Sequence, residues 1–197
     1  MDAATTFEAS SAAPLVRARE VAMLLFELRR EPGTPQTLSP EVAERVLNRC
    51  VISVLEVLAE DGTEVVVAGT PKLPVIEARY DGREATLRAA CAADAVLAVV
   101  RRVQRARENE FRVVGAITAG QAGDGPDGVP MTKGEADVRL HRLSETAAPG
   151  QVLMSAAARE ACGGSVDAVQ VRAAEDPAGE AYLFRGLAAA GRVPEGE

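Results

Sequence analysis

The sequence predicts an α+β domain, in which helices pack on a mixed, mainly antiparallel β-sheet. Apolar runs of strand length alternate with long stretches of helical period. Two of the strand-like runs follow each other across a short Gly-Thr-Pro-Lys turn. The resulting order, β-α-β-β-α-β-α-β-α-β-β, lacks the regular alternation of a doubly wound fold, and no internal repeat is visible.

The size and composition are those of one globular domain. The chain has 197 residues, of which 47% are hydrophobic and 26% charged. Residues 1–18 are small and polar, and residues 189–197 show no apolar period. We therefore expect a domain over residues 19–188, with a flexible N-terminal arm at 1–18 and a flexible C-terminal tail at 189–197.

Charge and cysteine usage exclude several classes of function. The net charge of −7 argues against a nucleic-acid or anionic-membrane partner. Cys50, Cys91 and Cys162 lie far apart, and together with the single histidine, His141, they match no zinc spacing. Three reduced, mostly buried thiols, no apolar run of membrane-spanning length and no signal-peptide pattern predict a cytoplasmic protein.

The first strand and the first helix have the clearest local signals. Residues 20–29, EVAMLLFELR, form a continuous apolar run typical of a central strand. The next element is a helix, because Ser39 is a suitable N-cap, Pro40 suits the first helical position and Gly62 ends the apolar period. Its predicted buried face consists of Val42, Val46, Leu47, Cys50, Val51, Val54 and Leu58.

The stretch VVVAGTPKLPVIEARY, residues 65–80, has two interpretations. Gly-Thr-Pro-Lys at a strand turn suggests a phosphate-binding loop. However, it lacks the Gly-x4-Gly-Lys-Ser/Thr spacing and does not precede a helix. We therefore predict a β-hairpin with its tip near Thr70 and Pro71.

The remaining elements are predicted from the spacing of apolar residues and from the residues that cap helices and form turns. Ser155 is a predicted N-cap, and a Pro149-Gly150 turn ends the helix before it. A helix over 83–108 is expected to bury Leu87, Ala90, Cys91, Leu97, Val100 and Val103. The pattern then predicts strands at 111–120, 151–155, 165–173 and 180–187, helices at 132–146 and 156–164, and a surface loop at 121–130.

Several of these stretches together resemble the class III adenylate/guanylate cyclase catalytic domain. That family's opening strand, normally ending Phe-Ala-Asp-Ile, is similar to LLFEL, and its first long helix to LSPEVAERVLNRCVISVLEVLAEDG. VGAITAG resembles the family's Ile-Gly-Ile-His-Thr-Gly strand. HRLSETAAPGQVLMS resembles a block in which Ala-Arg-Leu is followed by five residues, then by Pro-Gly, a strand and a Ser. YLFRGL resembles the Tyr-x-Val-x-Gly-Leu ending. The resemblance covers about residues 20–187 and implies a mixed sheet with a ferredoxin-like core.

The resemblance also implies a chemistry and a partner. In this family two metal ions, held by two aspartates, acidify the ribose 3′-hydroxyl, which then attacks the α-phosphate of a nucleoside triphosphate. The partner subunit supplies base-reading groups, an Asn and an Arg. The site therefore lies between two chains, and a dimer is expected.

Both positions of the metal-binding aspartates differ in this sequence. The first falls on Glu27, which keeps the charge but moves the oxygens by one methylene, so that Glu27 is a weak candidate for a metal ligand. The second falls on Thr70, whose neutral hydroxyl does not replace a carboxylate.

The positions that contact the nucleotide differ as well. The base-reading positions fall on Val66 and near Met131, the Asn falls on Val138, and only the Arg is kept, as Arg142. Arg142 is equally compatible with a phosphate contact and a salt bridge. His141 has no identifiable Ser or Cys partner, so we expect a surface or interface histidine.

Because each charge-stabilising group commonly contributes on the order of a hundredfold to turnover, these differences predict a pseudoenzyme that needs no cofactor. The leading hypothesis is a dimerisation or regulatory protein-interaction module in bacterial-type signalling, as a homodimer or as a heterodimer with a cyclase-like or other signalling protein. The alternatives are a nucleotide- or anion-binding sensor that uses Arg142, and a residual weak cyclase in which Glu27 holds Mg²⁺ or Mn²⁺.

Overall fold

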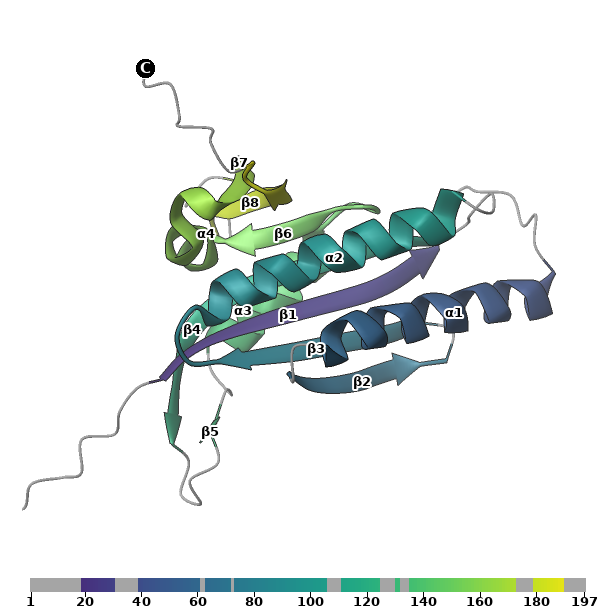
Figure 1. The fold of residues 1–197 in the computed structure, drawn as a ribbon, viewed down its shortest axis with the longest axis horizontal. Coiled ribbons are helices and arrows are strands. Elements are labelled where there is room, and N and C mark those ends of the chain that lie inside the picture. The colour runs from purple at the N-terminus through teal and green to yellow at the C-terminus, as the bar shows by residue number, and fades with distance from the viewer. Residues whose placement is uncertain are drawn as a thin grey trace, which may run out of the picture.

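The structure is a computed structural model, shown in Figure 1. It describes residues 19–30, 39–60, 63–71, 73–105, 111–124, 130–131, 135–172 and 179–189. The predicted arm at 1–18 lies outside these residues, as does the tail from residue 190 onward.

The strands and helices follow the predicted order, with one additional short strand, β5, before the third helix. The strands are β1 (Arg19–Arg30), β2 (Glu64–Thr70), β3 (Leu73–Asp81), β4 (Phe111–Asp124), β5 (Pro130–Met131), β6 (Val152–Ser155), β7 (Val166–Arg172) and β8 (Ala181–Leu187). The helices are α1 (Pro40–Ala59), α2 (Ala85–Arg105), α3 (Glu135–Thr146) and α4 (Ala156–Cys162), followed by a short 3-10 turn, η1 (Gly163–Ser165).

The sheet is mixed and mainly antiparallel, which confirms the predicted fold class. Its strand order is β2-β3-β1-β4-β6-β8-β7, with β5 paired to β4 beside this path. Strands β4 and β6 run parallel, whereas the other neighbouring pairs are antiparallel. Strands β2 and β7 are therefore the two edges of the sheet.

Helices cover both faces of the sheet. Successive residues of β1 point to opposite faces, so that β1 contributes apolar side chains to a core on each side. Ala22, Leu24 and Phe26 belong to the larger core, which α1, α2 and α4 cover. Val21, Met23 and Leu25 belong to a smaller core, to which α3 contributes Leu140 and Leu143. We call these two sides of the sheet the α1/α2 side and the α3 side. Figure 1 shows α1 and α2 side by side in front of the strands.

Helix α1 begins as its sequence predicts. The hydroxyl of Ser39 accepts a hydrogen bond from the backbone N–H of Val42, and Pro40 occupies the first helical position. The helix ends at Ala59, before the expected Gly62, which lies outside the described residues. The predicted buried face is confirmed, because Val46, Leu47, Cys50, Val54 and Leu58 are buried and Val42 and Val51 pack partly against them.

Helix α2 matches its predicted buried face at Ala90, Leu97 and Val100 and differs from it elsewhere. Cys91 is exposed and Leu87 is half-buried, whereas Ala85, Ala89 and Ala93 are fully buried. Small alanines let a helix approach its neighbours closely, but they give a weak apolar signal in the sequence. The assignment of Cys91 to the core was therefore wrong.

Strand β4 also differs, because it continues to Asp124 and pairs there with the short strand β5. Part of the expected loop at 121–130 is thus strand, and its residues 125–129 lie outside the described residues. None of the helices in the described parts of the chain is long and apolar enough to cross a membrane.

Candidate functional site

The α3 side of the sheet brings together the strand positions that the resemblance singled out. Glu27 on β1 pairs with Val75 on β3, and Val75 pairs with Ala68 on β2. Because side chains alternate along a strand, Val66 and Thr70 share the face of Ala68. Glu27, Val66 and Thr70 therefore lie on one face, which α3 flanks.

Both carboxylate oxygens of Glu27 are engaged. Its Oε1 accepts a hydrogen bond of 2.6 Å from the hydroxyl of Ser144 on α3. Its Oε2 lies 2.7 Å from Nη2 of Arg29 and accepts a hydrogen bond of 2.8 Å from Nε of that residue. Arg29 also donates from Nη2 to the backbone carbonyl of Ser144, at 3.3 Å. The three residues form a closed set of contacts that joins β1 to α3.

Thr70 completes the tip of the hairpin. Thr70 and Leu73 pair across the two-residue turn, and the Thr70 hydroxyl accepts a hydrogen bond of 3.2 Å from the N–H of Leu73. Gly69 precedes it with a φ of +82°, in the left-handed region that favours glycine. The predicted hairpin is confirmed, and the Thr70 hydroxyl stabilises its turn through this hydrogen bond.

The nucleotide-contacting positions are spread over β2, β5 and α3. Val66 on β2 and Val138 on α3 are each 50% exposed. Met131 is the second residue of β5 and pairs with Gly123 of β4. Arg142 is an exposed residue of α3, and its backbone carbonyl accepts a hydrogen bond from the Thr146 hydroxyl.

His141 lies between two carboxylates at the border of β3 and α3. Its Nε2 is 3.6 Å from an oxygen of Glu77 on β3 and 3.6 Å from an oxygen of Asp137, one turn earlier in α3. Since Val66 is paired with Glu77, this cluster borders the exposed part of β2. The His141 side chain is 47% exposed, in agreement with the expected surface histidine.

A two-metal centre does not fit the described residues at these positions. Glu27 has both oxygens engaged by Ser144 and Arg29, and Thr70 brings no charge. Over the described ranges, no group of three or more His, Cys, Asp and Glu side chains is arranged to hold a metal ion. The candidate that the sequence offered for a metal ligand, Glu27, accepts hydrogen bonds from Ser144 and Arg29.

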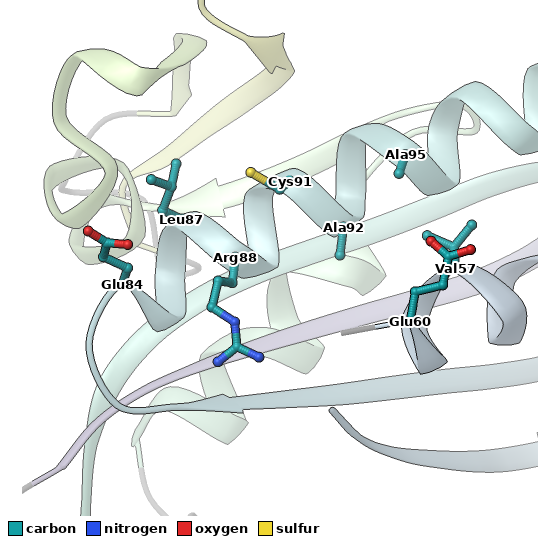
Figure 2. A pocket seen from close by; sticks show the side chains of 8 residues that line it. All are labelled: Val57, Glu60, Glu84, Leu87, Arg88, Cys91, Ala92 and Ala95. Atoms are coloured by element: carbon teal, nitrogen blue, oxygen red, sulfur yellow. The ribbon is translucent and has the colours of Figure 1, made fainter. Parts of the chain in front are cut away.

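A pocket of about 420 Å³ lies on the α1/α2 side, away from all of these positions. It is formed by Val57 and Glu60 near the end of α1 and by residues of the first turns of α2. Figure 2 shows Arg88 directed toward the strands and Cys91 directed away from them. The guanidinium of Arg88 lies 5.4 Å from the centre of the Tyr80 ring, an arrangement typical of a cation–π contact.

The sequence did not reveal the partners of Glu27 and His141. Arg29 follows Glu27 by two positions, so the alternation of a strand alone places both side chains on one face and offered a usable signal. Ser144 and Glu77 carry no such signal, because each is far from its partner along the chain.

Comparison with known proteins gives the fold. No protein-family model matches the sequence, and no curated protein matches it. Among solved structures, the guanylyl cyclase Cya2 superposes with a TM-score of 0.65 and 18% identity, over 89% of this chain and 96% of that chain. The adenylyl cyclase CyaB from P. aeruginosa gives a TM-score of 0.68 and 10% identity, over 89% and 97%. The non-canonical dimeric guanylyl cyclase domain of the RhoGC fusion protein from the aquatic fungus Blastocladiella emersonii gives 0.68 and 12%, over 86% and 98%.

The chain therefore has the fold of the class III adenylyl/guanylyl cyclase catalytic domain, as the sequence resemblance predicts. The same comparisons correct the expectation that the chain is no enzyme. The structures that share its fold are described as cyclases. Likeness at 10–18% identity shows the fold and assigns no activity to this chain, so inactivity does not follow from the replaced residues.

Proposed function

We propose that the chain is a dimerisation or regulatory protein-interaction module built on the cyclase fold. The observation that carries the proposal is the exposure of large apolar side chains on both faces of the β2–β3 hairpin and on α3. Val66 and Val138 are each 50% exposed, Val67 52% and Leu73 56%. Apolar surface of this kind gains free energy when it is buried against a partner.

The engagement of Glu27 supports the same proposal. A carboxylate that is held by Ser144 and Arg29 stiffens the junction of β1 and α3. A rigid surface loses less conformational entropy when a partner binds. A second copy of the chain is the simplest partner, and a cyclase-like or other signalling protein is the alternative.

Size-exclusion chromatography with light scattering tests the proposal. We expect a concentration-dependent dimer of the purified chain, because the exposed apolar surface is limited. A strict monomer at tens of micromolar would contradict self-association. The known forms of the RhoGC domain, described as dimeric and as monomeric, are suitable mass references for the two states.

Anion binding is a second candidate function, and Arg142 favours it. Arg142 is exposed on α3, and in the described part of the chain no ion pair engages its guanidinium. A free guanidinium suits phosphate oxygens. Calorimetry with ATP, GTP and cyclic nucleotides tests this function, with Arg142→Ala as the control. No heat with any of these ligands would remove the candidate.

Cyclase activity is a third candidate, which the fold alone favours. The assay uses ATP or GTP with Mg²⁺ or Mn²⁺ and compares the wild type with Glu27→Ala. Cyclic product that forms equally with both proteins would point to a contaminating enzyme. Product that is lost with Glu27→Ala would support a role of this carboxylate in turnover.

A further inference from the structure

The edge strand β2 is largely exposed, and only Val65 packs partly against the core on the α1/α2 side. All seven of its residues except Val65 are exposed, including Val66 on the α3 side and Val67 on the α1/α2 side. Figure 1 shows β2 as the outermost strand, beyond β3. The backbone groups that β2 directs away from β3 face this open edge, where they are able to pair with another strand.

β2 also lacks the features that normally protect an edge strand. Its only charged residue is Glu64, at its first position, and its register with β3 has no shift, although Gly69 near its end has a φ of +82°. The opposite edge, β7, carries Asp167 and Arg172 and has two register shifts against β8. Charges and bulges discourage the addition of a further strand, so β7 is better protected against strand addition than β2.

We propose that β2 pairs antiparallel with β2 of a second copy of this chain, about a two-fold axis at Val67. The inference rests on the proposed function, because it names the surface through which the module dimerises. In this register Val67 faces Val67 of the other copy, and Val66 faces Ala68. All seven residues of β2 are paired, and every other register pairs fewer of them.

The charges of β2 agree with this register. Glu64 faces the neutral Thr70 of the other copy, so that no like charges stand opposite each other. A register centred on Glu64 would oppose two carboxylates. The interface is small, since one strand from each copy provides it, and we expect a weak, reversible dimer with a micromolar dissociation constant.

Charge substitution at the proposed axis tests the inference. In Val67→Lys, two ammonium groups face each other, and we expect a dissociation constant at least about tenfold higher than in the wild type. Val171→Lys is the matched control, because Val171 is a valine of the other edge strand, 47% exposed. We expect this variant to dimerise like the wild type.

A mixing experiment makes the test specific for the two-fold axis. Val67→Lys and Val67→Glu are each expected to dimerise more weakly than the wild type, whereas an equimolar mixture is expected to restore dimers, because Lys then faces Glu. Sedimentation velocity measures all three samples. Unimpaired dimers of Val67→Lys would overturn the β2 pairing and leave self-association of the module intact, whereas a monomeric wild type would overturn both the β2 pairing and self-association.

Hydrogen exchange on the wild type gives a readout that needs no variant. Amides of β2 that face the open edge are expected to exchange more slowly at concentrations where the dimer forms than after dilution. β7 provides the internal control, with exchange independent of concentration. Equal exchange of β2 in the dimer and the monomer would contradict the inference.

Discussion

The hydroxyl of Ser144 lies 2.6 Å from Oε1 of Glu27 and ties helix α3 to strand β1. Ser144 is almost completely buried, at 1% exposure, and its single hydroxyl proton is shared between Glu27 and the more distant carbonyl of His141, at 3.2 Å. Glu27 occupies the position at which the cyclase resemblance places a metal-binding aspartate. Its geometry in this chain is that of a structural contact, and this distinction is open to measurement.

Glu27→Ala is expected to lower the free energy of unfolding by about 1–3 kcal/mol, since it removes the acceptor of a buried hydroxyl and the partner of Arg29. Glu27→Gln keeps an oxygen for Ser144 and is expected to lose less. Urea denaturation measures both variants, with Glu145→Ala on the exposed face of α3 as the control. An increase in stability with Glu27→Ala would indicate a carboxylate that is strained for function.

Gly69→Ala is expected to destabilise the hairpin by roughly 1–3 kcal/mol. The φ of Gly69 is +82°, and a Cβ at this position would overlap the carbonyl oxygen of Leu73 and lie 3.2 Å from the N of Val75. Gly150 has a similar φ of +86° and open space around it. Gly150→Ala therefore isolates the cost of the dihedral angle in thermal melts, and equal losses for the two variants would disprove the steric contribution at Gly69.

Cys91 is expected to be the first thiol to react with an aromatic disulfide reagent in the native protein. It is exposed, whereas Cys50 and Cys162 are buried and burial raises the pKa of both thiols. The fast phase should correspond to one thiol and disappear in Cys91→Ser, with the remaining two reacting after denaturation. A fast phase that persists in this variant would refute the assignment.

The stability of the protein is expected to fall at alkaline pH, in part through Cys162. Burial raises the pKa of this thiol from 9.0 to about 11. The folded state then holds a proton that the unfolded state releases, so the contribution is complete below pH 9.0 and is lost as the pH rises toward 11. Denaturant midpoints across this range should decline less steeply in Cys162→Ala, and an unchanged slope would contradict the prediction.

The sequence predicted where most residues of the candidate site lie along the strands and helices, but it predicted few of the contacts between their side chains. The hairpin tip at Thr70 and the strand position of Glu27 follow from local patterns of turn and alternation. The engagement of Glu27 by Ser144 does not, because the two residues are 117 positions apart and meet only when α3 packs on the sheet. His141 meets Glu77 for the same reason.

The sequence by itself determined the order of the elements, the Ser39 cap of α1, the hairpin and the fold class. These depend on interactions within a few residues and on the period of apolar side chains, which a linear chain displays directly. Only the tertiary structure decided that Cys91 faces solvent, that β5 pairs with β4 and that β2 is an unprotected edge. Each of these depends on which distant segment occupies the neighbouring space, and the packing of helices and strands settles that only once the whole sheet is assembled.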